Sequence, residues 1–443
     1  MNKQYKMYKS GKNWVYSMVA VSLLTFGVGF SMQSASLLVE HSVVKADHVE
    51  KTAIQSAPDS IFYDTNHFPN ISDISSRNPL GIASLFSIFS KNANLGADVN
   101  GNVATQTLSN SNRDFGTNTN NMNNSDIDLS YIQNLSGAIN DRAFRSEKSA
   151  AIFGRSVKLT NDDGHISVDF SRVSTLNSDN TFQDQNGKKY IDFDDYFEQL
   201  AQKSDSYINT AQTEGVSVDF SDMNKQVIDV SKANKTSGYI YVDVDYSKLN
   251  GPQPITIKGL SSQINGTNVI INVNNAPTNS STQTQINYVY DNGQLVSGNS
   301  ENHVLPNHVV WNFGSKIEQV NVSSGRLLGS ILAPSATVNA GVNIDGNIVA
   351  NNVNISGGES HRWDVTTPSS DTPSSDTPSS DTPSSDVPSS DVPSSDTPRS
   401  NKNGEKLPDA AKNNQKKGSN LSISLVIGSL WFTSFLLKKN DDK

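Results

Sequence analysis

The segments GSILAPSATV (Gly329–Val338) and GNIVANNVNI (Gly346–Ile355) decide the fold, because the second repeats the first at an offset of 17 residues (329 to 346). At this offset the aligned pairs are Ile331 with Ile348, Leu332 with Val349, Ala333 with Ala350, Ala336 with Val353, and Val338 with Ile355. Short β-rich segments with small apolar residues and Asn or Gly turns are typical of stacked solenoid coils. The repeat therefore predicts successive coils of a β-solenoid.

A third copy of the pattern lies far upstream, at Ala97–Ala104 (ADVNGNVA). Two close copies and one distant echo leave a β-sandwich as the alternative fold. Further strands are expected where polar and apolar residues alternate or where β-branched residues cluster. These segments are His165–Phe170, Gly238–Tyr246, Ile255–Ile257, Asn268–Val273, Ile286–Tyr290 and His308–Phe313.

Helices are expected beside these strands. The segment from Asp192 to about Ala211 carries an apolar stripe at helical spacing, so one helix should lie with this face on the β-structure. The stripe consists of Phe193, Tyr196, Phe197, Leu200, Tyr207, Ile208 and Ala211. A second helix is predicted over Ser130–Arg145. The predicted fold class is therefore mainly β, a β-solenoid domain over residues 78–365 with one or two flanking α-helices.

The N-terminus has the three parts of a secretory signal peptide. A basic stretch precedes the apolar run Val15–Phe30, and small residues follow up to Ala46. We expect cleavage between Ala46 and Asp47, which removes residues 1–46 and leaves residues 47–77 as a flexible leader. The basic stretch KMYKSGKNW (Lys6–Trp14) resembles the KxYKxGKxW-type signal peptide of long Gram-positive surface adhesins.

A repeat follows the predicted domain. Residues 368–397 are six copies of PSSDT or PSSDV. Proline at every fifth position favours extended polyproline-II, and Ser and Asp offer nothing to bury. Thirty such residues at about 3.1 Å each reach roughly 90 Å. Residues 366–406 are therefore predicted to be a disordered, solvated stalk.

The chain ends in a pattern that resembles a sortase sorting signal, over residues 407–443. The motif is Leu407, Pro408, Asp409, Ala410 and Ala411. A polar spacer, the apolar run Leu421–Leu437 and two lysines follow, and the run is predicted to be a membrane helix. Ala410 and Ala411 stand where the sortase motif has Thr and Gly, which should weaken cleavage. We expect retention at the cell surface, through sortase and peptidoglycan or, failing that, through the membrane helix.

Five segments of the central region resemble the choice-of-anchor A domain of Gram-positive surface proteins. They are NPLGIASLFSIFSKNANLGADVNGNVAT (Asn78–Thr105), VDFSDMNKQVIDVSKA (Val218–Ala233), ITIKGL (Ile255–Leu260), VVWNF (Val309–Phe313) and GSILAPSATVNAGVNIDGNIVANNVNISGGESHRWDV (Gly329–Val365). The resemblance implies a β-solenoid-like adhesive head, and the family's name reflects its pairing with different C-terminal anchors. It brings no ligand and no binding residues to this chain.

Candidate catalytic or metal-ligating groups are few. Glu359 and His361 are two residues apart and would share one face of a strand, so they could ligate a metal or act as an acid/base pair. The alternative is that Glu359 accepts hydrogen bonds while Trp363 closes the core. His303 and His308 are five residues apart across a proline, which suits a loop rather than a ligand pair.

Two acidic clusters have structural interpretations. The segment Asp162–Gly164 is typical of a turn, with a calcium loop as the alternative. Asp192, Asp194 and Asp195 lie at the predicted helix start, where carboxylates interact favourably with the helix dipole. The motifs of nucleotide binding, zinc proteases and serine hydrolases do not occur in the sequence. We therefore expect neither catalytic residues nor metal or cofactor.

Composition limits the function further. The net charge of −9 argues against nucleic acid as a partner, and the absence of cysteine excludes disulfides and thiol chemistry. We expect a non-enzymatic surface adhesin that binds host extracellular matrix, mucin or glycans. The alternatives are a wall-bound glycan-active enzyme, similar to a polysaccharide lyase, and a self-associating wall protein. An ice-binding face would need a repeated Thr ladder, whereas the offset of 17 sets Thr337 opposite Asn354.

Overall fold

The computed structural model describes residues 6–10, 13–17, 54–59, 77–111, 113–117, 128–145, 149–235, 238–297 and 303–368. The first two ranges form an antiparallel pair of strands, β1 (Lys6–Ser10) and β2 (Asn13–Ser17). The predicted stalk beyond residue 368, the sorting motif, the segment Leu421–Leu437 and the cleavage site at Ala46 and Asp47 lie outside the described residues. Within the described part, no helix is both long and apolar enough to span a bilayer.

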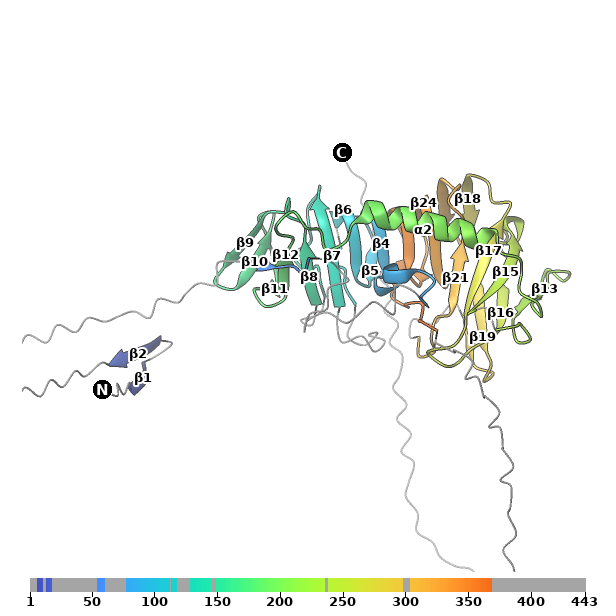
Figure 1. The fold of residues 1–443 in the computed structure, drawn as a ribbon, viewed down its shortest axis with the longest axis horizontal. Coiled ribbons are helices and arrows are strands. Elements are labelled where there is room, and N and C mark those ends of the chain that lie inside the picture. Colours follow the sequence, from blue (N-terminus) through green and yellow to red (C-terminus); the bar gives the residue numbers. More distant parts are fainter. Residues whose placement is uncertain are drawn as a thin grey trace, which may run out of the picture. The chain divides into compact units, whose positions relative to one another are not determined.

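One long sheet of parallel strands organises the domain (Figure 1). In spatial order it contains β15 (Tyr239–Asp245), β17 (Asn268–Asn274), β21 (Val309–Asn312), β24 (Ser330–Ala340), β26 (Ile348–Ile355), β4 (Ile88–Leu95), β6 (Val103–Ser111), β7 (Asp128–Leu135), β8 (Ser149–Phe153), β12 (Thr181–Gln183) and β3 (Gln55–Ser56). Each neighbouring pair is parallel. A β-sandwich is built from antiparallel sheets, so that alternative is wrong.

The remaining strands complete the coils. β18 (Asn279–Thr282) and β22 (Gln319–Val322) extend the long sheet beside β24. A second sheet contains β13 (Ser217–Asp219), β14 (Gln226–Asp229), β16 (Ile255–Leu260), β19 (Ile286–Tyr290) and β20 (Leu295–Val296), and a third contains β23 (Leu327–Leu328), β25 (Ile344–Asp345), β27 (Glu359–His361) and β5 (Asp98–Asn100). Successive coils thus stack in parallel, as in a β-solenoid. At one end, β9 (Leu159–Asp162), β10 (His165–Val168) and β11 (Ser171–Asn177) form an antiparallel sheet.

The coils do not follow one another in sequence order along the solenoid. After the short edge strand β3, the chain joins the middle of the long sheet at β4 and builds outward through β6, β7, β8 and β12. The helix α2 (Phe193–Ile208) then runs back across the sheet, and the second series begins at β15 (Figure 1). This series returns strand by strand until β26 pairs with β4 and β27 pairs with β5. The last coil therefore stacks directly on the first.

Helix α2 covers one face of the sheet with the predicted apolar stripe. The three aspartates lie at the helix start, as predicted; Asp192 is the N-cap, and its side chain accepts hydrogen bonds from the backbone of Asp194 and Asp195. Sixteen residues at about 1.5 Å each give roughly 24 Å, enough to cross five strands at about 4.8 Å spacing. Phe193 and Phe197 pack on Phe89 of β4, while Tyr207 reaches β17 and donates its hydroxyl to the Pro79 carbonyl.

The predicted second helix over Ser130–Arg145 is wrong. Residues Asp128–Leu135 form β7, between β6 and β8. Tyr131 packs toward α2, whereas Ile132 faces the solenoid core. Because both faces of this strand are covered, its sequence lacks the alternation that identifies a half-exposed strand. In the predicted leader, Gln55–Ser56 adds a short strand to the edge of β12.

The repeat at Gly329 and Gly346 marks stacked coils, but its offset is not constant. Ile331, Leu332 and Ala333 lie opposite Ile348, Val349 and Ala350, as predicted. The register then shifts, so that Val338 lies opposite Val353 and Ala340 opposite Ile355. The pairings of Ala336 with Val353 and of Val338 with Ile355 are therefore wrong, as is the placement of Thr337 opposite Asn354.

Two extra residues in β24 cause this shift. The irregularity lies between Ala333 and Thr337, at Pro334, which cannot donate to the ladder. The glycines that open the two repeats, Gly329 and Gly346, stay stacked on each other. A Cβ on Gly346, whose φ is 146°, would lie 2.5 Å from the carbonyl carbon of Gly329. Only glycine fits at this close approach of two coils.

Phe89→Ala should lower the free energy of unfolding by about 3–5 kcal/mol, because it empties the contact between α2 and β4. The Phe89 side chain is fully buried and touches Phe86, Phe193, Tyr196 and Phe197. Chemical unfolding measures the change. Met223→Ala, at a position 61 % exposed, is the control and should stay within about 0.5 kcal/mol. Equal effects of the two variants would contradict this packing.

Candidate functional site

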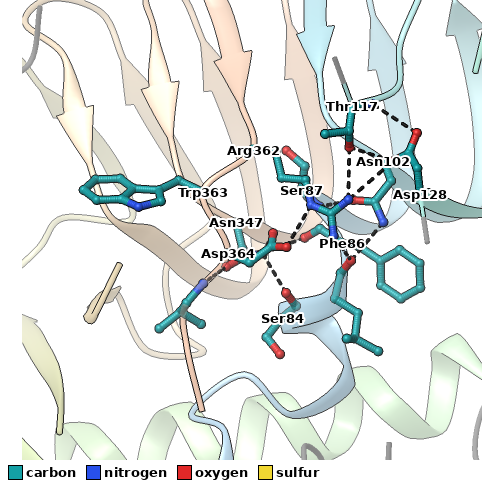
Figure 2. A network of polar contacts seen from close by, with 12 residues as sticks. Ser84, Phe86, Ser87, Asn102, Thr117, Asp128, Asn347, Arg362, Trp363 and Asp364 are labelled. Atoms are coloured by element: carbon teal, nitrogen blue, oxygen red, sulfur yellow. Dashed lines mark hydrogen bonds and ion pairs between the residues drawn. The ribbon is translucent and has the colours of Figure 1, made fainter. Parts of the chain in front are cut away.

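The closing motif GGESHRW (Gly357–Trp363) places Arg362 in a buried polar network between the last coil and the first (Figure 2). The Arg362 guanidinium donates from Nη1 to Thr117 Oγ1 at 3.0 Å and lies 3.4 Å from Asp128 Oδ1. Its Nε donates to Asp364 Oδ2 at 2.8 Å. Asp128 is 1 % exposed and also accepts hydrogen bonds from Thr117 and Ser149. The network therefore compensates a buried carboxylate with a buried cation.

Two corner asparagines hold the turn that leads into β4 (Figure 2). Asn347 Nδ2 donates to the carbonyls of Phe86 at 2.8 Å and Ser84 at 3.1 Å. On the other side, Asn102 Nδ2 donates to the Leu85 carbonyl at 2.9 Å, and its Oδ1 accepts the Ser87 amide at 3.0 Å. Asn102 belongs to the distant echo Ala97–Ala104 and takes the same place in its coil as Asn347. The echo is therefore a structural repeat.

Glu359 and His361 share one face of β27, as predicted, and join a buried cluster. His361 Nε2 lies 2.9 Å from Glu359 Oε2, and His361 Nδ1 lies 2.8 Å from Asp345 Oδ1. His303 Nε2 approaches Asp345 Oδ2 at 2.9 Å and its ring stacks on Trp363. Arg326 Nη2 donates to Asp345 Oδ1 at 3.0 Å; its Nε lies 2.8 Å from Oδ2 without hydrogen-bond geometry.

The charges in this cluster compensate one another. Burial alone would raise the pKa of Asp345, but hydrogen bonds from His303 and His361 and the nearby Arg326 charge lower it to about 2. Burial alone would lower the pKa of His361, but Asp345 and Glu359 raise it above its ordinary value. Both ring nitrogens of His361 thus face carboxylates, which occupies the atoms that a metal would need. Among the described residues, no group of three or more acidic or histidine side chains could hold a metal ion.

The other sequence candidates also occupy structural positions. His308 is fully buried, where its Nε2 donates to the Gln263 carbonyl at 2.9 Å and its Nδ1 accepts from Thr366 Oγ1 at 2.9 Å. His303 and His308 thus have separate partners. The segment Asp162–Gly164 forms the turn between β9 and β10, with Asp163 and Gly164 both at positive φ. This conformation is that of a hairpin turn, as predicted.

A polar face that the sequence does not reveal lies on β18, on β22 and on the C-terminal parts of β24, β26, β4, β6 and β7. Two rows of outward side chains cross the same set of parallel strands, and together we call them the amide ladder. The first row is Asn279, Gln319, Thr337, Asn352, Asn92, Thr107 and Asn134; the second is Ser281, Asn321, Asn339, Asn354, Asn94 and Asn110. At about 4.8 Å per strand, the first row is roughly 30 Å long.

Hydrogen bonds between the side chains align the amide ladder. In the second row, Asn354 Nδ2 donates to Asn339 Oδ1 and Asn339 Nδ2 donates to Asn321 Oδ1, each at 2.8 Å. In the first row, Asn92 Nδ2 donates to Asn352 Oδ1 at 2.8 Å, and Asn352 donates to Thr337 Oγ1 at 3.1 Å. The residues between the rows point inward; Val338 and Val353 are fully buried.

The ladder faces outward, and its own side chains carry no charge. All ladder residues are exposed or partly exposed. Lys91, which directly precedes Asn92 of the ladder, is paired with Asp194 of α2 at 2.7 Å. On the opposite rim, Ser323 and Gly341 are exposed, while Gly96 and Ser356 border a recess that also contains Arg113, Arg145 and Glu359. The helix covers the other half of the same strands, so the ladder is the half that stays open.

Arg362→Met should lower the free energy of unfolding by about 3–5 kcal/mol, because it leaves Asp128 buried without its cation. Adding Asp128→Asn should recover part of this loss, since the uncompensated charge is then gone. Arg155→Met, at an exposed position, is the control. A loss for Arg362→Met no larger than for Arg155→Met, in chemical unfolding, would show that the network is not needed.

Stability should also fall with acid through His308. Burial lowers the pKa of His308 to about 4 from an ordinary value of 6.5. Its contribution is complete above pH 6.5 and is lost as the pH falls toward 4, because the unfolded chain binds the proton first. The loss amounts to about 3 kcal/mol. His308→Gln should make the free energy of unfolding depend less on pH between 6.5 and 4 than it does in the parent, whereas the control His165→Gln, at an exposed site, should not. If the free energy of unfolding of His308→Gln and of the parent falls equally with pH, His308 is not the group responsible.

Comparison with known proteins identifies the family. The profile of the family described as "Putative Ice-binding-like adhesive domain" matches residues 79–362, more than half of the 443-residue chain. The KxYKxGKxW signal peptide profile matches residues 2–38, which indicates secretion. No curated protein matches the chain.

A solved structure is similar as well. It is the crystal structure of an ice-binding protein from an Antarctic bacterium, Flavobacteriaceae, at 14 % identity and a TM-score of 0.25. The match covers 72 % of this chain and 51 % of that one, so the chain spans about half the length of that protein. The family profile, by contrast, covers nearly all of the predicted domain 78–365. The chain therefore belongs to the family of ice-binding-like adhesive domains.

Proposed function

We propose that this protein is a non-enzymatic surface adhesin whose solenoid head binds host extracellular matrix, mucin or glycans. The observation that carries this proposal is the amide ladder, a long and regular polar face that α2 leaves uncovered on a domain of an adhesive family. A contact of this kind contributes about 0.5–1.5 kcal/mol. Strong attachment would come from many ladder contacts and many copies on each cell.

The rest of the chain would present this head, in the manner of a choice-of-anchor A protein. The signal peptide exports it, and the PSSD(T/V) repeats would hold it away from the wall. Sortase would join the chain to peptidoglycan at the bond between Ala410 and Ala411. Because both residues depart from the sortase motif, the segment Leu421–Leu437 would hold in the membrane any chain that is not cleaved.

The main rival is a wall-bound glycan-active enzyme. Its best location is the recess beside β5, where Arg145 faces carboxylates. Arg145 is engaged there by ion pairs with Asp98 and Asp114. Such pairing favours a structural role over proton abstraction, which needs a base that is available to the substrate. New chain ends released from glycans by the purified protein, and lost in Arg145→Met, would favour the enzyme.

A self-associating wall protein is the second rival. Solenoids associate through open terminal strands, and here the edge strand β15 is covered. Thr213 and Gln212 follow α2 and make hydrogen bonds to the backbone of Tyr241 and Asp243. At the other end, the terminal strand β3 pairs with β12 and is only two residues long. A covered edge at one end and a very short edge strand at the other favour a head that binds other molecules over one that polymerises.

Cells that lack this chain should adhere less than the parent to at least one of mucus, matrix protein and host glycan, because the head supplies the contact. Adhesion of the deletion strain, the parent and the complemented strain to coated surfaces measures this. The complemented strain should regain the parent's adhesion. If deletion leaves adhesion to every coat unchanged, the adhesin proposal fails.

A further inference from the structure

We infer that the amide ladder takes a neutral, linear polysaccharide laid along the solenoid axis. The inference rests on the proposed adhesive function and specifies its site and ligand class. Three features of the ladder carry it: side chains fixed before binding, rows without charge, and a period repeated over seven strands.

The ladder is ordered before any ligand arrives. Each Asn side chain has two N–H donors and one carbonyl oxygen with two lone pairs. The contacts along the rows, such as Asn354 to Asn339 and Asn92 to Asn352, engage one donor of each donating amide. The remaining donor and lone-pair capacity is held in register at about 4.8 Å intervals. Hydroxyl groups both donate and accept, so a polyhydroxylated chain can pair with these free donors and lone pairs. Binding costs little entropy, because the protein side chains are already ordered.

The charge of the ladder selects among glycans. The chain as a whole carries −9, yet both rows consist only of Asn, Gln, Ser and Thr. A sulfated or uronic-acid polymer would need Lys or Arg to compensate its charge. Lys91, which directly precedes Asn92 of the ladder, is already paired with Asp194 at 2.7 Å. Neutral sugars are therefore the matching class.

The ladder also lacks what a protein partner would need. Tight protein interfaces centre on buried aromatic, aliphatic or Arg anchors. The inward residues Val320, Val338 and Val353 are fully buried, and neither row holds an apolar or aromatic side chain. Many equal polar contacts in a line suit a polymer that repeats along the same line.

The test uses cells that display the full-length chain and beads coated with one probe each. The probes are two neutral polysaccharides, mannan and a linear β-glucan, then the acidic polysaccharide hyaluronan, and collagen. The ladder variant combines Asn92→Ala, Asn94→Ala, Asn352→Ala and Asn354→Ala. The matched control removes the same number of exposed amides elsewhere, with Gln199→Ala, Gln202→Ala, Asn224→Ala and Gln263→Ala. An antibody to the stalk equalises display, and thermal unfolding of each purified chain checks the fold.

We expect parent and control cells to bind a neutral polysaccharide equally, and the ladder variant to bind at least about tenfold less. Raising the salt from about 0.05 to about 0.5 M should leave binding unchanged, because no ion pairs form. If the fourfold variant unfolds below the assay temperature, the single variants Asn352→Ala and Asn354→Ala replace it, with an expected loss of a few-fold each.

Several outcomes would overturn the inference. Ladder-dependent capture of hyaluronan or collagen in place of the neutral probes would assign another ligand, and so would ladder-dependent shaping of ice crystals by the purified chain. Neutral binding that survives the ladder variant would place the site elsewhere. In each bead result the cells still adhere, so the adhesin proposal stands. Failure of parent cells to bind any coat would overturn both.

Discussion

The parallel pairing of β26 with β4 is the constraint on which the rest of the structure depends. It joins residues 260 positions apart, such as Asn92 and Asn352, and turns two separate series of coils into one sheet. The entropy cost of closing so long a loop grows only with the logarithm of its length, so hydrophobic stacking across the junction can exceed it. Without this junction, β4 and β26 would each be an open edge.

The other features of the domain serve this junction. Helix α2 carries the chain from the end of the first series to the start of the second, and its aromatic side chains cover β4 on the way. Arg362, Asn347 and Asn102 fix the turn before β4 to the coils on both sides. The hydrogen bonds from Asn78 to Val365 and Thr367 bring the two ends of the domain together.

The sequence predicted part of this arrangement for reasons that are local. The repeat at Gly329 and Gly346, the apolar stripe of α2 and the acidic residues at its start depend on short-range spacing. The register shift after Ala333 leaves no trace in the pattern, because two extra residues near Pro334 are accommodated within one continuous strand. The strand β7 resembles a helix in sequence because burial on both faces removes the alternation of polar and apolar residues. The pairing of β4 with β26 depends on contacts across most of the chain, which no local pattern specifies.

The candidate site was missed for a related reason. Asparagine usually indicates a turn, so no pattern in the sequence marks Asn339, Asn352 and Asn354 as members of outward rows. Their role appears only when the correct register sets Asn354 beside Asn339 on one side and Asn94 on the other. The histidines showed the opposite pattern. Glu359 and His361 stood out in the sequence, yet they lie in a compensated cluster under the last coil.

The most direct test of this account is a cross-link across the junction. The chain has no cysteine, so Asn94→Cys with Asn354→Cys adds one pair on neighbouring strands. At about 4.8 Å spacing this pair can form a disulfide, whereas Asn94→Cys with Asn339→Cys, two strands apart at roughly 9.6 Å, cannot. Mild oxidation followed by mass spectrometry of peptides should find the first link and not the second. Absence of the first link in folded protein, or formation of the second, would contradict the junction and the ladder built on it.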